Sequence, residues 1–300
     1  MNKKNKNNLP KVILMTQTRT NKYKNLDIWK SFVNYKKNNF LETEFIINHQ
    51  KNSSIKTHEI EKFHDHIKIE TPFIPLSEAR NKLLEIAINH YDNYDYFLFL
   101  DDDSYLYDYN LLMESLIYCK INQYKGLIIG SIYKPNLKFI NKHMKFLNPF
   151  TLLGHKDHNL IMGSCICFGR DLISKNIRFD IRFGLGSIYG GSEETDLFFN
   201  ALTHKISCYY NQCFIVIHPP TYKNQYSFKR MYQYGKGRGA VYRKYLSTNK
   251  SKFFYYLIYG LIGNFILSIF GLITFQRSYF LRNIGLLIGK LNGFLSFKRK

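Results

Sequence analysis

The chain has 300 residues, of which 45% are hydrophobic and 17% aromatic. This composition excludes a disordered protein, because it can fill a sizeable core in one large or two small domains. The net charge of +21 predicts an anionic partner: nucleic acid, anionic lipid or a phosphorylated substrate.

Residues 1–8 are rich in lysine and asparagine and carry no apolar stretch, so we expect a disordered basic tail and no secretion signal. Short apolar runs then alternate with helix-like segments, which predicts an α/β domain over residues 9–245. Strands are expected at residues 12–15, 45–47, 66–69, 97–100, 127–132 and 161–168. Helices are expected at residues 77–89, 111–120 and 170–174, the first capped by Ser77.

The junction between the apolar run 97–100 and Asp101, Asp102 and Asp103 is the most informative feature of the sequence. Three acids at the carboxyl end of a buried strand repel one another unless a cation lies among them. Mg2+ and Mn2+ prefer carboxylate oxygens and often complete their shell with substrate phosphates. The junction therefore predicts a metal-bridged phosphate ester or anhydride, with a solvated acidic turn as the alternative.

The segment 135–159 is a long polar and aromatic connection that contains three histidines: His143, His155 and His158. Loops of this length are often functional. Either a metal site or solvated histidines would explain the pattern.

A second group of acids opens the helix predicted after Ser192: Glu193, Glu194 and Asp196. Acids in a first turn stabilise a helix, which is one explanation for all three. Helical spacing places Glu194 on the face of Leu197 and the next apolar residues, and Glu193 and Asp196 on another side. An inward carboxylate at the mouth of a fold is a candidate general base.

Taken together, these segments resemble the family 2 glycosyltransferases with a GT-A fold. The matching segments appear in the family's order across residues 10–240: the loop Thr16 to Arg19 after the first strand, Ala79-Arg80-Asn81, Asp101-Asp102-Asp103, Gly163-Ser164 and Gly191 to Leu197. The resemblance implies a Rossmann-like mixed sheet with flanking helices. It also implies inverting transfer of a sugar from a nucleoside diphosphate sugar, usually a UDP-sugar, to an acceptor hydroxyl.

The resemblance also assigns roles to residues. Asp101 and Asp103 would hold Mn2+ or Mg2+ against the diphosphate, with Asp102 beside them. Thr16, Thr18, Arg19 and Arg80 would lie near the nucleotide. His218, after the apolar run 214–217, would complete the metal shell or occupy a simple turn.

Two departures from the family pattern leave alternatives open. Glu194 stands where the family usually has aspartate as the catalytic carboxylate, so the base could instead be Glu193 or Asp196. The second strand ends in Ile47-Asn48-His49, where the family often has an aspartate near the nucleotide.

Residues 246–300 differ in composition, and residues 253–275 include no charged side chain. This stretch is long enough to cross a bilayer core of about 30 Å. Basic residues flank it on both sides, which favours a monotopic hairpin or interfacial helices on anionic lipid over a single span. We therefore expect C-terminal membrane-associated helices at the cytoplasmic face of a bacterial inner membrane.

A membrane-held enzyme most economically uses a membrane-held acceptor, so we expect a lipid-linked or lipopolysaccharide glycan in surface polysaccharide synthesis. Two other classes remain as alternatives. A haloacid dehalogenase type phosphatase also places Asp-x-Asp after a strand, but Tyr105 stands where that motif has threonine or valine. A nucleic-acid-binding protein would use the positive charge, yet the acidic residues and apolar tail argue against nucleic acid as a partner.

Overall fold

The computed structural model describes residues 9–19, 22, 29–30, 33, 43–51, 59–62, 66–91, 93–133, 150–218 and 227–298. The chain divides into two compact units. The first comprises Met1–Ile74, Glu78–Arg178 and Asn200–Pro220, and the second comprises Pro75–Ser77, Phe179–Phe199 and Thr221–Lys300. The expected tail of residues 1–8 and His143 lie outside the described residues. The predicted boundary between residues 245 and 246 stays a prediction.

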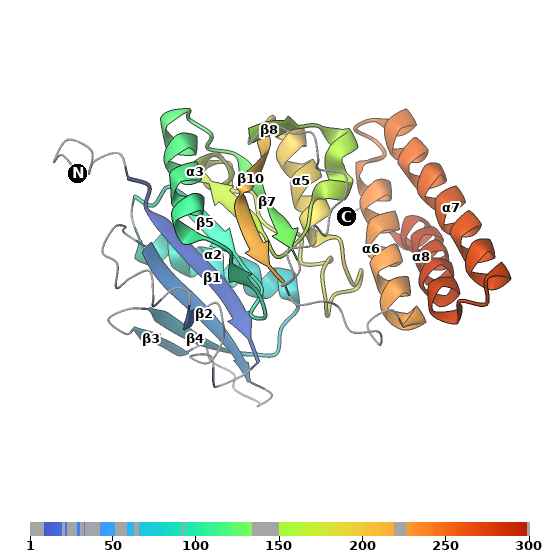
Figure 1. Ribbon diagram of the computed structural model, residues 1–300, viewed down its shortest axis with the longest axis horizontal. Helices are drawn as coiled ribbons and strands as arrows, with labels where there is room; N and C mark the ends of the chain where they lie inside the picture. Colours follow the sequence, from blue (N-terminus) through green and yellow to red (C-terminus); the bar gives the residue numbers. More distant parts are fainter. Residues whose placement is uncertain are drawn as a thin grey trace. The chain divides into compact units, whose positions relative to one another are not determined.

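The first unit is built on one mixed sheet whose strand order is β3-β4-β2-β1-β5-β9-β7-β10-β6, with β8 also paired to β10 (Figure 1). The strands are β1 Val12–Thr18, β2 Thr43–Lys51, β3 Glu59–Lys62, β4 Ile67–Pro72, β5 Tyr96–Phe99, β6 Tyr105–Leu106, β7 Leu127–Tyr133, β8 Phe150–Leu153, β9 Ile166–Gly169 and β10 Cys208–Ile217. The neighbours β4, β2, β1 and β5 run parallel, and β9 is antiparallel to both β5 and β7. This confirms the predicted mixed α/β sheet.

The helices are α2 Leu76–His90, α3 Tyr109–Ile121, α4 Arg170–Ser174, α5 Glu193–Thr203, α6 Phe228–Tyr245, α7 Lys250–Ile273 and α8 Arg277–Ser296, with a 3-10 helix, η4, at His155–Leu160. Asp108 caps α3, since its carboxylate accepts a hydrogen bond from the Leu111 amide at 3.2 Å. His155 and His158 lie in η4, where the His158 ring contacts the His155 carbonyl at 3.0 Å.

Predicted boundaries were wrong at several elements, including β1, β9 and α2. β1 continues through Thr18 because Gln17 and Thr18 pair with Asn48 and His49 of β2, so the expected loop after Met15 is strand. The strand expected from residue 161 begins only at Ile166. Ser77 lies inside α2, and its hydroxyl donates to the Phe183 carbonyl at 2.7 Å instead of capping the helix.

In the second unit, glycines spaced four residues apart line the contact between α6 and α8. A Cβ added to Gly239 would lie 2.0 Å from the Lys290 carbonyl oxygen, and one added to Gly289 would lie 2.2 Å from the Tyr232 carbonyl oxygen. The small side chains thus allow the two backbones to touch, an arrangement common between helices in membranes. Gly285, Gly289 and Gly293 repeat the contact along α8.

Because no side chain fits between these backbones, Gly289→Ala should lower the free energy of unfolding by about 1–3 kcal/mol. Gly263 of α7 is the matched control, since a Cβ there meets nothing within 4 Å. Gly263→Ala should be neutral or stabilising by up to about 1 kcal/mol, through helix propensity alone. Thermal unfolding of the two variants measures the difference, and equal midpoints would contradict this packing.

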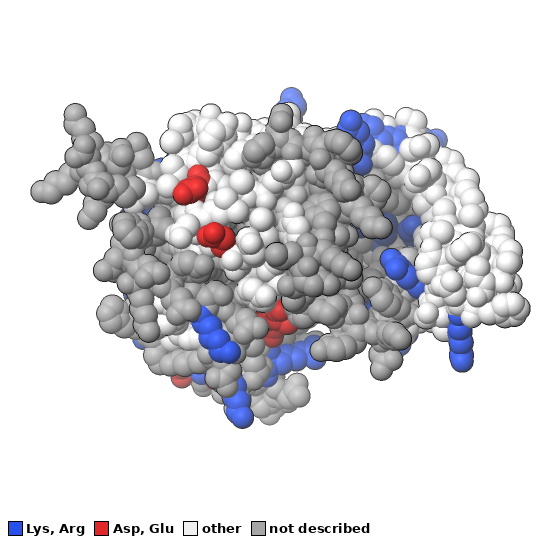
Figure 2. All heavy atoms as spheres, in the orientation of Figure 1, with Lys and Arg blue, Asp and Glu red and all other residues white. Residues whose placement is uncertain are grey.

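α7 is long and apolar enough to cross a membrane by length and composition, a criterion that a core helix of a soluble protein can also meet. Most of α7 is nevertheless exposed, and its outward side chains are largely aromatic or aliphatic. In Figure 2 this surface, over α7 at the right, is white with lysine and arginine at its margins.

Candidate functional site

The acidic residues after β5 form a tight turn in the first unit. The Leu100 amide still donates to the Met15 carbonyl at 3.0 Å, so the turn starts where β5 leaves its neighbour β1. The Ser104 hydroxyl and amide then donate to the Asp101 carbonyl at 2.7 and 3.1 Å. These two hydrogen bonds close a short turn that carries Asp101 and Asp103.

His218 reaches this turn because two strands pair just behind it. The short strand β6 follows the acids, and its Tyr105 lies opposite Ile217 at the end of β10. His218, the next residue, has its Nε2 at 3.3 Å from Asp103 Oδ1 and 3.9 Å from Asp101 Oδ2. The potential ligand atoms of these three residues all lie within 4.8 Å of one another.

Two carboxylates and one imidazole fit a divalent cation. Carboxylate oxygens suit Mg2+ and Mn2+, and imidazole is a further ligand for first-row transition ions. The separation of the ligand atoms is compatible with a single ion among them. The structure thus assembles the three residues that the sequence analysis proposed as metal ligands.

Arg80 of α2 holds one member of the group in place. Its side chain is 4% exposed, and its Nη2 donates to Asp101 Oδ1 at 3.3 Å and to the Gly163 carbonyl at 3.1 Å. A buried guanidinium bound to a carboxylate fixes the direction of that carboxylate. Arg80 and Gly163, both noted in the sequence analysis, therefore lie beside Asp101, a member of the candidate metal-binding group.

Asp102 has a different environment from its two neighbours. Burial and the nearby charges of Asp103 and Asp101 raise its pKa, while a hydrogen bond from the Thr18 hydroxyl opposes the rise. Thr18 is the last residue of β1, so this bond joins the acidic turn to that strand. Arg19 follows Thr18 in the sequence, and its guanidinium lies 4.4 Å from the centroid of the Phe73 ring.

Unsatisfied polar atoms occur toward the ends of β1 and β2, on both faces of the sheet. Thr16 Oγ1, Gln17 Oε1 and Asn48 Nδ2 are buried and have no hydrogen-bond partner within the described part of the chain. Gln17 and Asn48 are also partners in the β1–β2 ladder. A buried donor or acceptor without a partner costs about 1–3 kcal/mol, which a bound ligand or water would recover.

The acids of α5 lie in the second unit and are buried in an order that contradicts the predicted helical phase. Glu193 is 6% exposed and Asp196 is fully buried, whereas Glu194 is partly exposed. The prediction failed because it assumed that every residue outside the apolar stripe faces solvent. Ser192, the residue before α5, has a left-handed φ of 67°, unlike the extended backbone typical of an N-cap.

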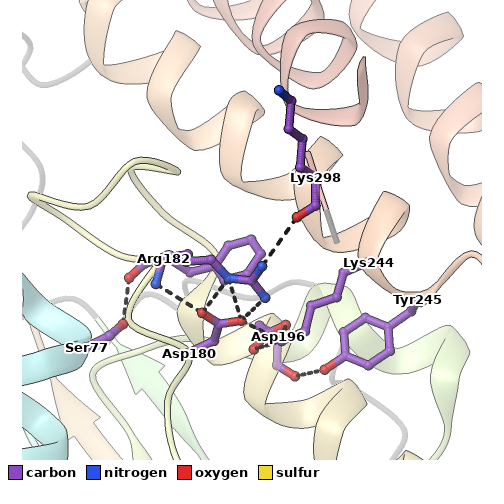
Figure 3. Close-up of polar contacts among 8 residues, drawn as sticks. Ser77, Asp180, Arg182, Asp196, Lys244, Tyr245 and Lys298 are labelled. Carbon is purple, nitrogen blue, oxygen red and sulfur yellow. Dashed lines mark hydrogen bonds and ion pairs between the residues drawn. The ribbon is translucent and has the colours of Figure 1, made fainter. Parts of the chain in front are cut away.

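Asp196 is buried because Lys244 of α6 supplies a counter-charge. The Lys244 ammonium donates to both Asp196 carboxylate oxygens at 2.6 and 2.9 Å and to Asp180 Oδ2 at 2.9 Å (Figure 3). Tyr245 adds a bond from its hydroxyl to the Asp196 carbonyl at 3.0 Å. Burial raises the pKa of Asp196 to about 6 against the opposing effect of Lys244. The ammonium of Lys244 thus favours the charged form of Asp196, which burial disfavours.

Asp180 completes this network. Burial favours its neutral form, but hydrogen bonds from Arg182 and the charge of Lys244 hold its pKa well below the usual range. Arg182 reaches it with Nη2 at 2.6 Å and also donates to the Lys298 carbonyl at 3.5 Å (Figure 3). Sequence reasoning missed Asp180, Arg182 and Lys244, since no local pattern links Lys244 to Asp196 and Asp180, which lie 48 and 64 positions away.

Comparison with solved structures identifies the fold. PcManGT from Pyrobaculum calidifontis, a mannosyltransferase solved with GDP-Man and Mn2+, has a TM-score of 0.54 and 10% identity, over 95% of this chain and 87% of that one. S. aureus TarS has a TM-score of 0.50 and 13% identity, over 79% of this chain. The matched region spans only 40% of the TarS chain.

The chain has the GT-A glycosyltransferase fold. No protein-family model matches the sequence, and no curated protein matches it significantly. At identities of 10–13% these similarities establish the fold, and the reaction has to be argued from the site.

Proposed function

We propose that the protein is a metal-dependent, inverting glycosyltransferase of family 2 that uses a nucleoside diphosphate sugar. The observation that carries the proposal is the convergence of Asp101, Asp103 and His218, with Arg80 holding Asp101, in a GT-A fold. A divalent cation held there would neutralise the charge that develops on the diphosphate leaving group.

The nucleotide would occupy the carboxyl ends of β1 and β2, as is usual for ligands of open α/β sheets. The unsatisfied hydroxyl of Thr16, on the same face of β1 as Thr18, offers a hydrogen bond there. Arg19 and Arg80 supply positive charge for the phosphates. The family resemblance favours UDP, while the PcManGT structure contains GDP-Man, so the base is the first quantity to test.

Glu194 is our candidate for the base that removes the proton of the acceptor hydroxyl as its oxygen attacks the anomeric carbon. It is the least buried of the three acids of α5, which suits a group that must meet a substrate. Glu193 remains the alternative. Asp196 already shares both oxygens with Lys244, so we assign it the role of holding α5 and α6 together.

The acceptor would be a membrane-linked glycan of a surface polysaccharide, such as lipopolysaccharide or capsule, used at the cytoplasmic face of a bacterial inner membrane. The exposed apolar surface of α7 supports this assignment. Its side chains include Tyr259, Ile262 and Phe265, which are 69%, 54% and 56% exposed. A monomeric soluble protein rarely leaves so large an apolar surface uncovered.

Thermal unfolding with UDP, GDP, CMP and TDP, each with and without Mn2+, tests the donor assignment. A ligand that binds only the native state raises the unfolding temperature, and the free energy gained is about 2.7 kcal/mol at a hundred times its Kd. We expect one nucleotide to stabilise the protein only when Mn2+ is present. Stabilisation by none of them would contradict the proposed function.

A further inference from the structure

The chain after Asp196 is strongly and one-sidedly charged. Asp196 is the last acidic residue, and 16 lysines and arginines follow it. All three helices α6, α7 and α8 lie in this acid-free segment. Their basic side chains therefore have no carboxylate partner among themselves.

The side chain of one of these lysines, Lys290, reaches from α8 to α7. Lys290 of α8 donates from Nζ to the Gly260 carbonyl at 3.1 Å and to Asn264 Oδ1 at 2.6 Å, both on α7. Asn264 in turn donates to Asn283 Oδ1 at 3.2 Å. Within the described residues these partners are neutral oxygens, so the charge of Lys290 is solvated locally but not balanced.

Arg238 of α6 lies near the same ammonium group. Burial, together with the charge of Arg238, lowers the pKa of Lys290 to about 8. The Arg238 side chain bonds the Tyr242 hydroxyl, yet its Nη1 is buried and finds no hydrogen-bond partner in the described chain. Two like charges and an unused buried donor are costly together, unless an anion joins them.

The surroundings indicate what kind of anion this is. Gly260, whose carbonyl Lys290 contacts, is partly exposed, and Tyr259 and Ile262 beside it belong to the apolar surface of α7. A ligand at this place would meet positive charge and hydrocarbon within a few residues. That combination matches a phosphate headgroup attached to acyl chains.

We propose that Arg238 and Lys290 form a binding site for the phosphate of an anionic lipid, whose acyl chains lie along α7. This inference depends on the membrane association proposed above. The site would make that association selective for charged lipid.

Flotation with two kinds of vesicle tests the site: phosphatidylcholine alone, and phosphatidylcholine with phosphatidylglycerol. The variant is Arg238→Gln, because it removes the charge and the unpartnered Nη1 donor, while the glutamine amide offers a replacement donor for the Tyr242 hydroxyl. Arg277→Gln is the control, as Arg277 is exposed at the start of α8 and its loss removes the same charge. Lys290→Met is a second variant at the site.

We expect Arg238→Gln to weaken binding to the phosphatidylglycerol vesicles about tenfold more than Arg277→Gln, and to leave binding to phosphatidylcholine unchanged. Its unfolding temperature without lipid should change little, since the repulsion from Lys290 and the bond to Tyr242 are altered together. Equal losses in the two variants would show diffuse charge attraction and overturn the site.

A second experiment, without vesicles, distinguishes binding of a lipid headgroup from binding of free phosphate. Short-chain phosphatidylglycerol should raise the unfolding temperature of the wild type more than inorganic phosphate does, and the excess should vanish in Arg238→Gln and Lys290→Met. An equal rise with inorganic phosphate would overturn the lipid assignment. The Mn2+-dependent nucleotide shift should persist in both variants, so that failure of this site and failure of the proposed function can be told apart. Absence of binding to either vesicle would contradict the membrane association itself.

Discussion

Replacing Asp103 by alanine is expected to abolish the Mn2+-dependent part of nucleotide binding. Asp103 is the ligand candidate nearest to His218, at 3.3 Å, and it contributes one of two carboxylates in the group. Its loss would leave one carboxylate and one imidazole, too few protein ligands to hold the ion firmly against the phosphates. The stabilisation by nucleotide with Mn2+ should fall to the level seen without metal.

The neighbouring acid provides the control for this experiment. Asp102→Asn removes the same charge from the same turn but leaves the group of Asp101, Asp103 and His218 complete. It should retain Mn2+ dependence, and the asparagine amide oxygen can still accept the bond from the Thr18 hydroxyl. If Asp103→Ala keeps the full Mn2+-dependent rise in unfolding temperature, these acids do not bind the metal and form only an acidic turn.

The acidic turn could be predicted from sequence because its cause is local. A strand of four large apolar residues is followed at once by three acids, and the strand is buried as expected. His218 was found for the same reason, since it directly follows an apolar strand. What the sequence did not reveal was β6, a strand of only two residues whose pairing with β10 brings His218 to Asp103.

The helix α5 shows where local reasoning ends. Leu197, Phe198 and Ala201 are buried as the helical period predicts, but so are Phe199 and Asp196, which lie off that face. Burial of a carboxylate depends on a counter-charge, and Lys244 lies 48 residues away on another helix. Similarly, the short strand β3 escaped notice because three of its four residues are charged, and pairing with β4 alone defines it.

Replacing Glu194 by glutamine should leave donor binding intact and stop sugar transfer. Glutamine keeps the size of the side chain but cannot accept the proton of an attacking hydroxyl. Loss of a general base typically lowers a rate by about 10²–10⁴-fold. The Mn2+-dependent shift with the donor nucleotide measures binding, and release of nucleotide from the sugar donor in the presence of membrane lipid extract measures transfer.

Glu193→Gln is the matched comparison, because the two acids are adjacent in α5 and differ in exposure. If Glu193→Gln abolishes transfer while Glu194→Gln retains it, the more buried acid is the base. Asp196→Asn should instead affect folding, since breaking a buried ion pair costs about 3–5 kcal/mol and Lys244 would lose its closest partner. A stable Asp196→Asn protein that binds nucleotide but transfers no sugar would identify Asp196 as the base, and Lys244 as the group that tunes it.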